Sequence, residues 1–432
     1  MTLHVRMREW HDLTPEQLPA LAKFRLSDDW QTQQLVASLK DKIELVELRN
    51  GLHIHTSSFV GHLQIGDLHI TIQPKLNFNV LLTLFRYAYR LRDVSLVSDT
   101  DVEVEPNDFQ DLLIEQLAAE ATEIIARGLH RQYHRVDEAL ALPRGRLNMQ
   151  QIAQQGGIHD ARLPVIHHPR LEDHLVNRVL LAGLHLAARL TTNPIMGARL
   201  RRLGHLLKEN VTSISLSYDV LMQVRRQMNR LVSHYEPVIT LIELIFHAMG
   251  LSLEGQSETV RLPGFLFDMN QFFETLMSRF LSDHLPEYTV QDQYRLKGMM
   301  TYAREANPQR RQAPVPRPDF VVMQGNTLKA MLDAKYRNLW EKSLPRDMLY
   351  QLSIYALSQG SNGEAAILYP VTDSSAKPQI IEISDPLRGE QKARVFLRSV
   401  DLLQLTRLLQ DRSIQGEKQR GTLAFLLAFD TK

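Results

Sequence analysis

The sequence predicts a multidomain α+β protein, with a β-rich N-terminal part, a helical middle region and a C-terminal α/β domain that has a central mixed sheet. The chain has 432 residues, which exceeds the usual size of one domain. Its apolar residues alternate near the N-terminus, recur with a helical period in the middle, and combine both patterns in the last third. We expect domains over residues 1–105, 106–255 and 256–432.

Paired strands are expected in residues 1–105, because two turn dipeptides lie between alternating apolar runs. Asn50-Gly51 and Gly66-Asp67 are dipeptides that favour tight turns in β-hairpins. The strands that flank them are Ile43–Leu48 with Leu52–His55, and Phe59–Ile65 with Leu68–Ile72. A helix is expected to follow over Leu81–Leu91.

The middle region is predicted to be helical, because its apolar residues recur every three or four positions. In one helix these residues run from Phe109 to Ile124, and in another they run from Leu175 to Ala187. Further helices are expected within Ile195–Leu207 and Val220–His247. Residues 106–255 are therefore expected to form a helical domain.

Helices and strands alternate in residues 256–432. Asp268 is expected to cap the first helix, with Gln271 completing a capping box. The apolar residues from Phe272 to Phe280 form the buried stripe of that helix. The later elements are strands Asp319–Met323 and Leu328–Ala334, a helix from Ser343 to Leu357, and strands Ala365–Tyr369, Ile380–Ile383 and Val395–Leu397.

The composition excludes several classes of site and location. The chain contains no cysteine, so disulfides, thiol catalysis and cysteine-based zinc or iron–sulfur sites are ruled out. The sequence contains no run of about 18 apolar residues, so no membrane-spanning helix is predicted. The first ten residues also lack the apolar segment of a secretory signal. A cytoplasmic protein that does not enter a membrane is therefore expected.

The net charge is only +1, but basic residues gather in one segment. Between Tyr294 and Pro318 the only acid is Glu305. The basic residues there are Arg295, Lys297, Arg304, Arg310, Arg311 and Arg317. A solvated loop and a strip that contacts phosphates both explain this pattern.

Two aspartates and a lysine lie where the strands of the C-terminal hairpin are expected to meet. Asp319 opens the first strand, and Asp333 and Lys335 end the second. Phosphodiester hydrolysis needs a hard cation, and two carboxylates from adjacent strands form an oxygen site suited to Mg²⁺ or Mn²⁺. Lys335 follows Asp333 by two residues, so it lies on the same strand face and can stabilise developing charge.

The alternative is a pair of surface charges on a strand edge, because Asp-x-Lys occurs often by chance. The flanking residues Met331, Leu332, Ala334 and Tyr336 weaken this alternative. A strand this apolar is buried on at least one face, where two charges are costly unless they pair or bind a metal. The pattern therefore favours a metal-dependent site.

Three more residues are predicted to join this site. Glu274 on the preceding helix can add a third carboxylate, although a solvated helix residue is an equal alternative. Gln351 and Tyr355, four residues apart, share a helix face that can pack over the metal, the alternative being a surface pair. The predicted metal ligands are Asp319, Asp333 and Glu274, and the predicted catalytic residues are Asp319, Asp333, Lys335, Gln351 and Tyr355.

These motifs resemble the PD-(D/E)xK nuclease superfamily. Over residues 40 to 400 the chain is similar to the McrC family, the nuclease subunits of McrBC-type modification-dependent restriction systems. The matching residues are Phe59-Val60-Gly61, Ile72-Gln73-Pro74-Lys75, Pro143-Arg144-Gly145-Arg146, Glu172-Asp173-His174 with Asn177, Phe265, Asp268, Phe273 and Glu274, and Pro318-Asp319, Asp333-Ala334-Lys335 and Gln351 with Tyr355. The resemblance implies that the C-terminal domain is a PD-(D/E)xK nuclease.

The resemblance also implies a Mg²⁺-dependent DNA endonuclease subunit within a hetero-oligomeric defence complex. McrC-like proteins dock through their N-terminal portion on a separate AAA+ GTPase of McrB type and stimulate its nucleotide hydrolysis, so residues 1–105 are the expected docking domain. The chain has no Gly-x4-Gly-Lys-Ser/Thr loop, which agrees with a motor supplied by another protein. Two alternatives are a non-catalytic adaptor that regulates an AAA+ motor and a stand-alone DNA repair nuclease.

Overall fold

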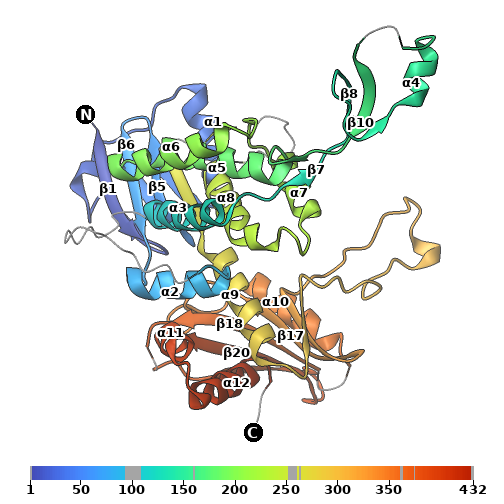
Figure 1. Cartoon of the computed structure of the whole chain (residues 1–432). Helices are drawn as coiled ribbons and strands as arrows, with labels where there is room; N and C mark the ends of the chain where they lie inside the picture. Colours follow the sequence, from blue (N-terminus) through green and yellow to red (C-terminus); the bar gives the residue numbers. More distant parts are fainter. Residues whose placement is uncertain are drawn as a thin grey trace. The chain divides into compact units, whose positions relative to one another are not determined.

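The computed structural model describes residues 2–92, 109–158, 161–251, 260–261, 264–360, 363–373 and 375–429 (Figure 1). The chain forms two compact units. The first unit joins Met1–Asp93 with Gly250–Lys432, and the second consists of Val94–Met249. Both ends of the chain thus belong to one unit. The predicted domain boundaries at 105/106 and 255/256 lie outside the described residues.

Two small sheets form the N-terminal part of the first unit. One contains, in order, β1 (Leu3–Arg8), β6 (Leu68–Gln73), β5 (Phe59–Ile65) and β14 (Gly264–Asp268). The other contains β2 (Asp12–Leu13), β4 (Gly51–Thr56) and β3 (Ile43–Leu48). Both predicted hairpins are confirmed, because β3 pairs with β4 and β5 pairs with β6 in antiparallel register.

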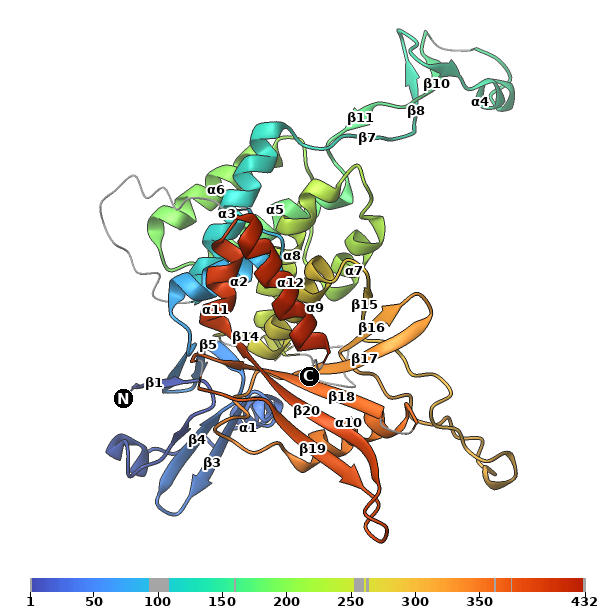
Figure 2. The same cartoon turned by 90° about the horizontal axis from the view of Figure 1, so that it is seen from below.

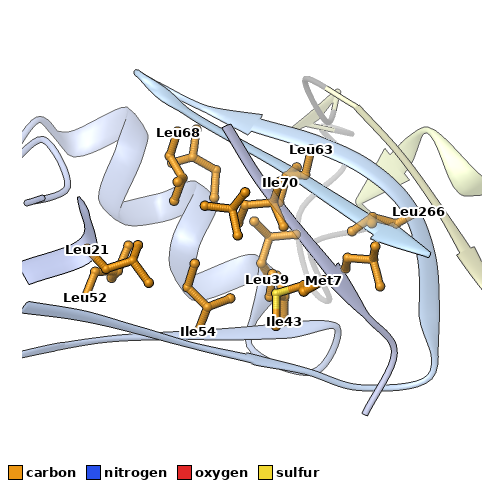
Figure 3. Packing of buried hydrophobic residues seen from close by; sticks show 13 residues of the cluster. Met7, Leu21, Leu39, Ile43, Leu52, Ile54, Leu63, Leu68, Ile70 and Leu266 are labelled. Atoms are coloured by element: carbon orange, nitrogen blue, oxygen red, sulfur yellow. The ribbon is translucent and has the colours of Figure 1, made fainter. Parts of the chain in front are cut away.

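Apolar side chains from both sheets form a common core (Figure 3). Alternate residues of each strand contribute to it, as the period of two predicts, so that Met7 and Ile70 from one sheet belong to the same cluster as Ile54 from the other. Leu39 of α1 (Trp30–Leu39) and Leu21 of η1 (Pro19–Ala22) complete the cluster. Burial of each such side chain stabilises the fold by about 1.5–3 kcal/mol.

Strand β14 joins the N-terminal sheet although it lies far along the chain, and a glycine permits the contact. Gly61 has a φ of +133°, and a Cβ at this position would lie 2.0 Å from the carbonyl oxygen of Phe265. Only glycine therefore allows β5 and β14 to approach so closely. The pairing places the start of α9 (Met269–His284) beside the N-terminal sheet.

A six-stranded sheet forms the C-terminal part of the first unit. Its order is β15 (Thr289–Asp292), β16 (Phe320–Gln324), β17 (Thr327–Ala334), β18 (Gly363–Val371), β20 (Gln391–Asp401) and β19 (Gln379–Ser384). The pairs β17–β18 and β18–β20 are parallel and the other pairs are antiparallel, so the sheet is mixed. α10 (Arg346–Leu357) links β17 to β18 and buries Leu352 and Tyr355 against the sheet. The predicted α+β class is confirmed.

Four helices of the first unit pack on one another. α9 contacts α2 (Phe78–Ala88) and α12 (Ile414–Ala428), and α11 (Leu402–Gln410) contacts α2, α12 and β20. A short pair of strands, β12 (Gly250–Leu251) and β13 (Val260–Arg261), precedes β14. Within the described ranges, no helix combines the length and apolar character needed to cross a membrane.

Helices dominate the second unit. The longer helices are α3 (Phe109–Arg127), α5 (Leu175–Leu190), α6 (Pro194–Lys208), α7 (Tyr218–Gln227) and α8 (Glu236–Ala248). The predicted helical runs are found, but Val220–His247 is divided into α7 and α8, with η2 (Ser233–Tyr235) between them. Pro237 lies in the first turn of α8, where a missing N–H costs nothing, whereas it would disrupt a continuous helix.

In the stretch of sequence between α3 and α5, the chain forms an extended arm of short strands (Figures 1 and 2). Its base pairs β7 (Gln132–Tyr133) with β11 (Arg170–Leu171). Its far part joins β8 (Val136–Leu140), β10 (Leu163–His167) and β9 (Arg146–Leu147) and carries α4 (Met149–Gln154). The hydrophobic pattern did not predict these strands, because most side chains of β7, β8, β9 and β11 are exposed or half-buried.

A candidate carboxylate–lysine site

Asp319 and Asp333 face each other across the hairpin formed by β16 and β17. The register pairs Phe320 with Leu332, which places the two aspartates opposite each other and on one sheet face. The N–H of Asp319 donates to Asp333 Oδ1 at 3.1 Å, and the N–H of Ala334 donates to Asp319 Oδ2 at 2.9 Å. Both carboxylates are buried, with 8% and 3% of the residue surface exposed.

Lys335 brings a cation to these carboxylates. Its backbone N–H donates to Leu368 O at 3.0 Å, so the residue continues the parallel pairing of β17 with β18. Its Nζ lies 3.7 Å from Asp319 Oδ2 and 3.8 Å from Glu274 Oε1. The structure thus brings four of the predicted site residues together.

Helix α9 supplies Glu274, and the predicted N-cap at Asp268 is confirmed, while the return bond from the Gln271 side chain stays a prediction. Asp268 accepts hydrogen bonds from the N–H groups of Asn270 and Gln271, at 2.8 and 3.4 Å. The apolar stripe from Phe272 to Phe280 is buried, so the orientation of the helix is fixed. Glu274 lies beside this stripe, and its side chain is 26% exposed.

The electrostatics of the site are unfavourable for three negative charges. Burial, together with repulsion from Asp319, raises the pKa of Glu274 to about 7 and the pKa of Asp333 to about 6, and Lys335 opposes both shifts. Burial by itself lowers the pKa of Lys335, but the surrounding carboxylates outweigh it and raise that pKa above its usual value. One ammonium group therefore compensates only part of the negative charge of this cluster.

Gln351 and Tyr355 differ in their relation to the site. Tyr355 is buried, and burial raises the pKa of its phenol. A hydrogen bond from Gln351 opposes this shift, and the nearby charges of Asp333 and Asp319 add to it. Gln351 is exposed and donates from Nε2 to the Tyr355 hydroxyl at 2.7 Å. Tyr355 thus lies near the aspartates, and Gln351 contacts Tyr355.

A family model described as "McrBC 5-methylcytosine restriction system component" matches residues 54–370, which is more than half of the chain. The chain belongs to this family. The predicted family is therefore confirmed, and all six predicted site residues of this McrBC-family chain lie within the matched span. No curated protein matches the chain.

Two solved structures are similar to this McrBC-family chain. One is the refined half-complex from the tetradecameric assembly of Thermococcus gammatolerans McrB AAA+ hexamers with bound McrC. A chain in it is 20% identical, with a TM-score of 0.60, and the match covers 98% of this chain and 100% of that chain. The other is the cryo-EM structure of the Thermococcus gammatolerans McrBC complex, with 21% identity, 66% and 88% coverage and a TM-score of 0.47. The first similarity shows a shared fold.

The sequence predicts a metal ion held by Asp319, Asp333 and Glu274. In the described part of the chain, no group of three or more His, Cys, Asp or Glu side chains is arranged to hold a metal ion. Instead, the Lys335 ammonium lies between Asp319 and Glu274. The chemistry of the donors nevertheless fits a hard cation, because three half-buried or buried carboxylates oppose a single ammonium.

The sequence did not point to Gln293. This residue follows β15, and its Nε2 donates to Asp319 Oδ1 at 3.2 Å, while its N–H donates to Asp319 O at 2.8 Å. It also begins the loop between β15 and β16, which contains η3 (Arg304–Ala306) and the basic segment. A glutamine that follows a short, exposed strand carries no sequence signal for this contact.

Proposed function

We propose that the chain is the Mg²⁺-dependent DNA endonuclease subunit of a McrBC-like, modification-dependent restriction system. Residues 256–432 are its PD-(D/E)xK nuclease domain. The observation that carries the proposal is the convergence of Asp319, Asp333 and Glu274 around Lys335. Strongly perturbed carboxylates beside a lysine are typical of catalytic sites.

Each residue of the site has a distinct part in this proposal. Asp319, Asp333 and Glu274 would hold Mg²⁺, which when bound polarises the phosphate and lowers the pKa of water. Lys335 Nζ donates hydrogen bonds to the phosphoryl oxygens, where negative charge grows in the transition state. Tyr355, oriented by Gln351, keeps bulk water away from the aspartates.

The basic loop between β15 and β16 supplies contacts to the DNA backbone. The exposed cations on it are Arg295, Lys297, Arg310, Arg311 and Arg317. The loop begins beside Asp319, since Gln293 and Asp319 are hydrogen bonded at its base. Affinity for the phosphate backbone rises with the number of cations that face the DNA. Because this loop offers only a few, the chain alone is expected to bind DNA weakly.

The proposal includes an AAA+ GTPase of McrB type as partner. The solved half-complex holds McrB AAA+ hexamers with bound McrC, and one of its chains shares the fold of this chain. In the proposed division of labour the partner recognises DNA that carries 5-methylcytosine and delivers it, while residues 1–105 dock on the partner and stimulate its nucleotide hydrolysis. Selection of the cleavage site then comes from the partner, and the carboxylate–lysine site cuts.

The experiment that tests this function is a cleavage assay with the full chain, the AAA+ partner, GTP and DNA with or without 5-methylcytosine. Cleavage is expected only with methylated DNA, GTP and Mg²⁺ or Mn²⁺, and EDTA is expected to stop it. Full activity in EDTA would show that the chemistry is wrong. Efficient cutting by the chain alone without GTP would favour the stand-alone nuclease.

A second candidate function is a non-catalytic adaptor that regulates an AAA+ motor. One observation favours it: in the structure as described, no three carboxylates are arranged around a metal position. The same assay separates the two functions. An adaptor stimulates GTP hydrolysis of the partner equally well when Asp333 is replaced by Asn, and no cleavage is observed with either form.

A further inference from the structure

Tyr336 directly follows Lys335, and its side chain connects the site to the N-terminal part of the first unit. Tyr336 is 4% exposed, and its hydroxyl donates to Glu9 Oε1 at 2.9 Å. Glu9, at the end of β1, is 1% exposed and also accepts from the N–H of Lys75 at 2.9 Å. Burial raises the pKa of Glu9 to about 7, so this carboxyl is held in place at a cost in stability.

The backbone of Tyr336 is held from both sides as well. Its N–H donates to Asn270 Oδ1 at 2.9 Å, and its carbonyl accepts from Trp10 Nε1 at 2.7 Å. Arg337 stacks over the Trp10 ring at 5.3 Å and closes the contact. The peptide groups on either side of Tyr336 are thus fixed, and Lys335 is attached to the first of them.

Asn270 attaches α9, the helix that carries Glu274, to the N-terminal sheet as well. Its Nδ2 donates to Ser58 Oγ at 2.8 Å, and the N–H of Met269 donates to Ser58 O at 2.9 Å. Glu274 follows Asn270 by four residues, so the two lie on one face of α9, one turn apart. Ser58 immediately precedes β5, the strand to which β14 pairs.

We propose that Asn270, Tyr336 and Glu9 are positioning residues. By fixing the backbones of β17 and α9 against the N-terminal sheet, they set the distance between Lys335 and the carboxylates. Lys335 and Glu274 come from different elements, and their contact of 3.8 Å is longer than a hydrogen bond. Their separation is therefore determined by where the backbones are held. Asn270 links the two backbones, because it accepts from the N–H of Tyr336, the residue after Lys335, and lies on the helix of Glu274.

This inference rests on the proposed nuclease function. A direct measurement at Lys335 distinguishes failure of the inference from failure of that function. The variants are Tyr336→Phe, which removes one hydroxyl, and Asn270→Leu, which removes the acceptor of the Tyr336 N–H. The matched control is Tyr235→Phe in the second unit, which also removes a buried hydroxyl that bonds to Asn177 Oδ1 at 2.8 Å. All are studied as the full chain, with thermal unfolding as the check on folding.

The first measurement is cleavage by the full complex, with kcat and the KM for DNA determined separately. Loss of groups that orient catalytic residues lowers activity by roughly 10- to 100-fold. We expect Tyr336→Phe and Asn270→Leu to lower kcat by about 10-fold or more, with little change in KM. The control Tyr235→Phe is expected to keep the wild-type kcat.

The second measurement is the rate at which trinitrobenzenesulfonate modifies Lys335, followed by peptide mass spectrometry. The paired Lys392, which bonds to Glu390 Oε2 at 2.8 Å, is the internal reference. Both variants are expected to raise the rate at Lys335 several-fold relative to Lys392, because the carboxylates no longer hold the ammonium.

Each combination of results decides the inference. Faster modification of Lys335 with lower kcat supports it, and faster modification in a chain that never cleaves DNA supports it while overturning the nuclease function. Unchanged kcat or unchanged Lys335 reactivity overturns it, and unchanged kcat leaves the nuclease function intact. A fall in kcat that is accompanied by equal acceleration at Lys335 and Lys392 shows general unfolding, and the positioning role is then wrong.

Discussion

The carboxylate–lysine site of the first unit and the cluster around Asp173 and Asn177 in the second unit are both built from polar residues that match McrC motifs. Their bonding differs. At the site, Lys335 lies 3.7 and 3.8 Å from its two carboxylates. In the other cluster, Arg178 binds Asp173 with two hydrogen bonds of 2.7 and 2.9 Å.

The second cluster satisfies nearly all of its polar groups. The N–H and hydroxyl of Thr212 complete the shell of Asp173, at 3.0 and 2.7 Å. Asn177 is fully buried and donates to the carbonyls of His130 and Glu172, at 3.0 and 2.7 Å. Its Oδ1 accepts from the Tyr235 hydroxyl. Such a closed network stabilises one conformation of the unit.

The direction of the pKa shifts separates the two clusters. The Arg178 hydrogen bonds hold the pKa of Asp173 well below its usual range, so its charge is stabilised. Burial instead raises the pKa values of Glu274 and Asp333, so their charges are destabilised. Similarity to a family motif does not distinguish these cases. The bonding indicates that the second cluster maintains the fold, and it supports the proposal that the first binds a ligand or carries out a reaction.

The largest expected effect is the loss of cleavage in Lys335→Ala. A cation that acts as charge develops in the transition state contributes to rate, and its removal costs about 100- to 1000-fold in kcat. Complex formation with the AAA+ partner is expected to persist, as measured by co-purification. The matched control is Lys329→Ala, an exposed lysine on the same strand β17. Wild-type cleavage by Lys335→Ala would make the lysine a bystander.

Asn177→Ala is expected to lower stability and leave cleavage by the folded protein unchanged, the opposite of Lys335→Ala. It removes donors and an acceptor from a buried network and leaves the Tyr235 hydroxyl and two carbonyls without their partner. The free energy of unfolding should fall by about 3 kcal/mol, while the kcat of the folded protein stays unchanged. Denaturant unfolding with Asn177→Ala and with the exposed Asn210→Ala as control measures this. A strong loss of kcat without loss of stability would contradict the structural role.

Acidification provides a weaker test of the same cluster. The folded-state pKa of Asp173 is lowered, so its ion pair with Arg178 contributes stability above the usual aspartate value of 3.8, and this contribution is lost as the pH falls below that value. The melting temperature of the wild type is expected to fall more steeply below about pH 4 than that of Asp173→Asn. Parallel curves for the two proteins would show that the pair contributes nothing.

The smallest effect is expected for Arg311→Ala on the basic loop. One exposed cation contributes a few-fold to DNA affinity, and its removal should lower the salt dependence of binding by about one charge. Fluorescence anisotropy with DNA at several salt concentrations measures both quantities. Arg388, which is exposed on the turn between β19 and β20, is the matched control. Equal effects of both substitutions would mean that the loop has no special contact with DNA.

The sequence by itself determined the local elements of the first unit. The turn dipeptides at Asn50 and Gly66, the cap at Asp268 and the apolar runs before Asp333 all predicted elements that the structure contains. Each of these signals lies within a few residues, because the periods of strands and helices are local properties of the backbone. The spacing of Asp319, Asp333 and Lys335 also allowed their proximity to be predicted, since a hairpin places its open ends together.

Tertiary structure decided what these elements contact. Glu9 and Tyr336 are 327 residues apart, and β14 adds to a sheet whose other strands precede it by a long stretch of chain. Gln293 reaches Asp319, and Asn270 reaches Tyr336, only because β15 and α9 are packed there. Such contacts depend on which sheet edges and helix faces meet, and no local period encodes that choice. The arm between α3 and α5 was missed for a related reason, because its exposed strands bury too little apolar surface to leave a pattern.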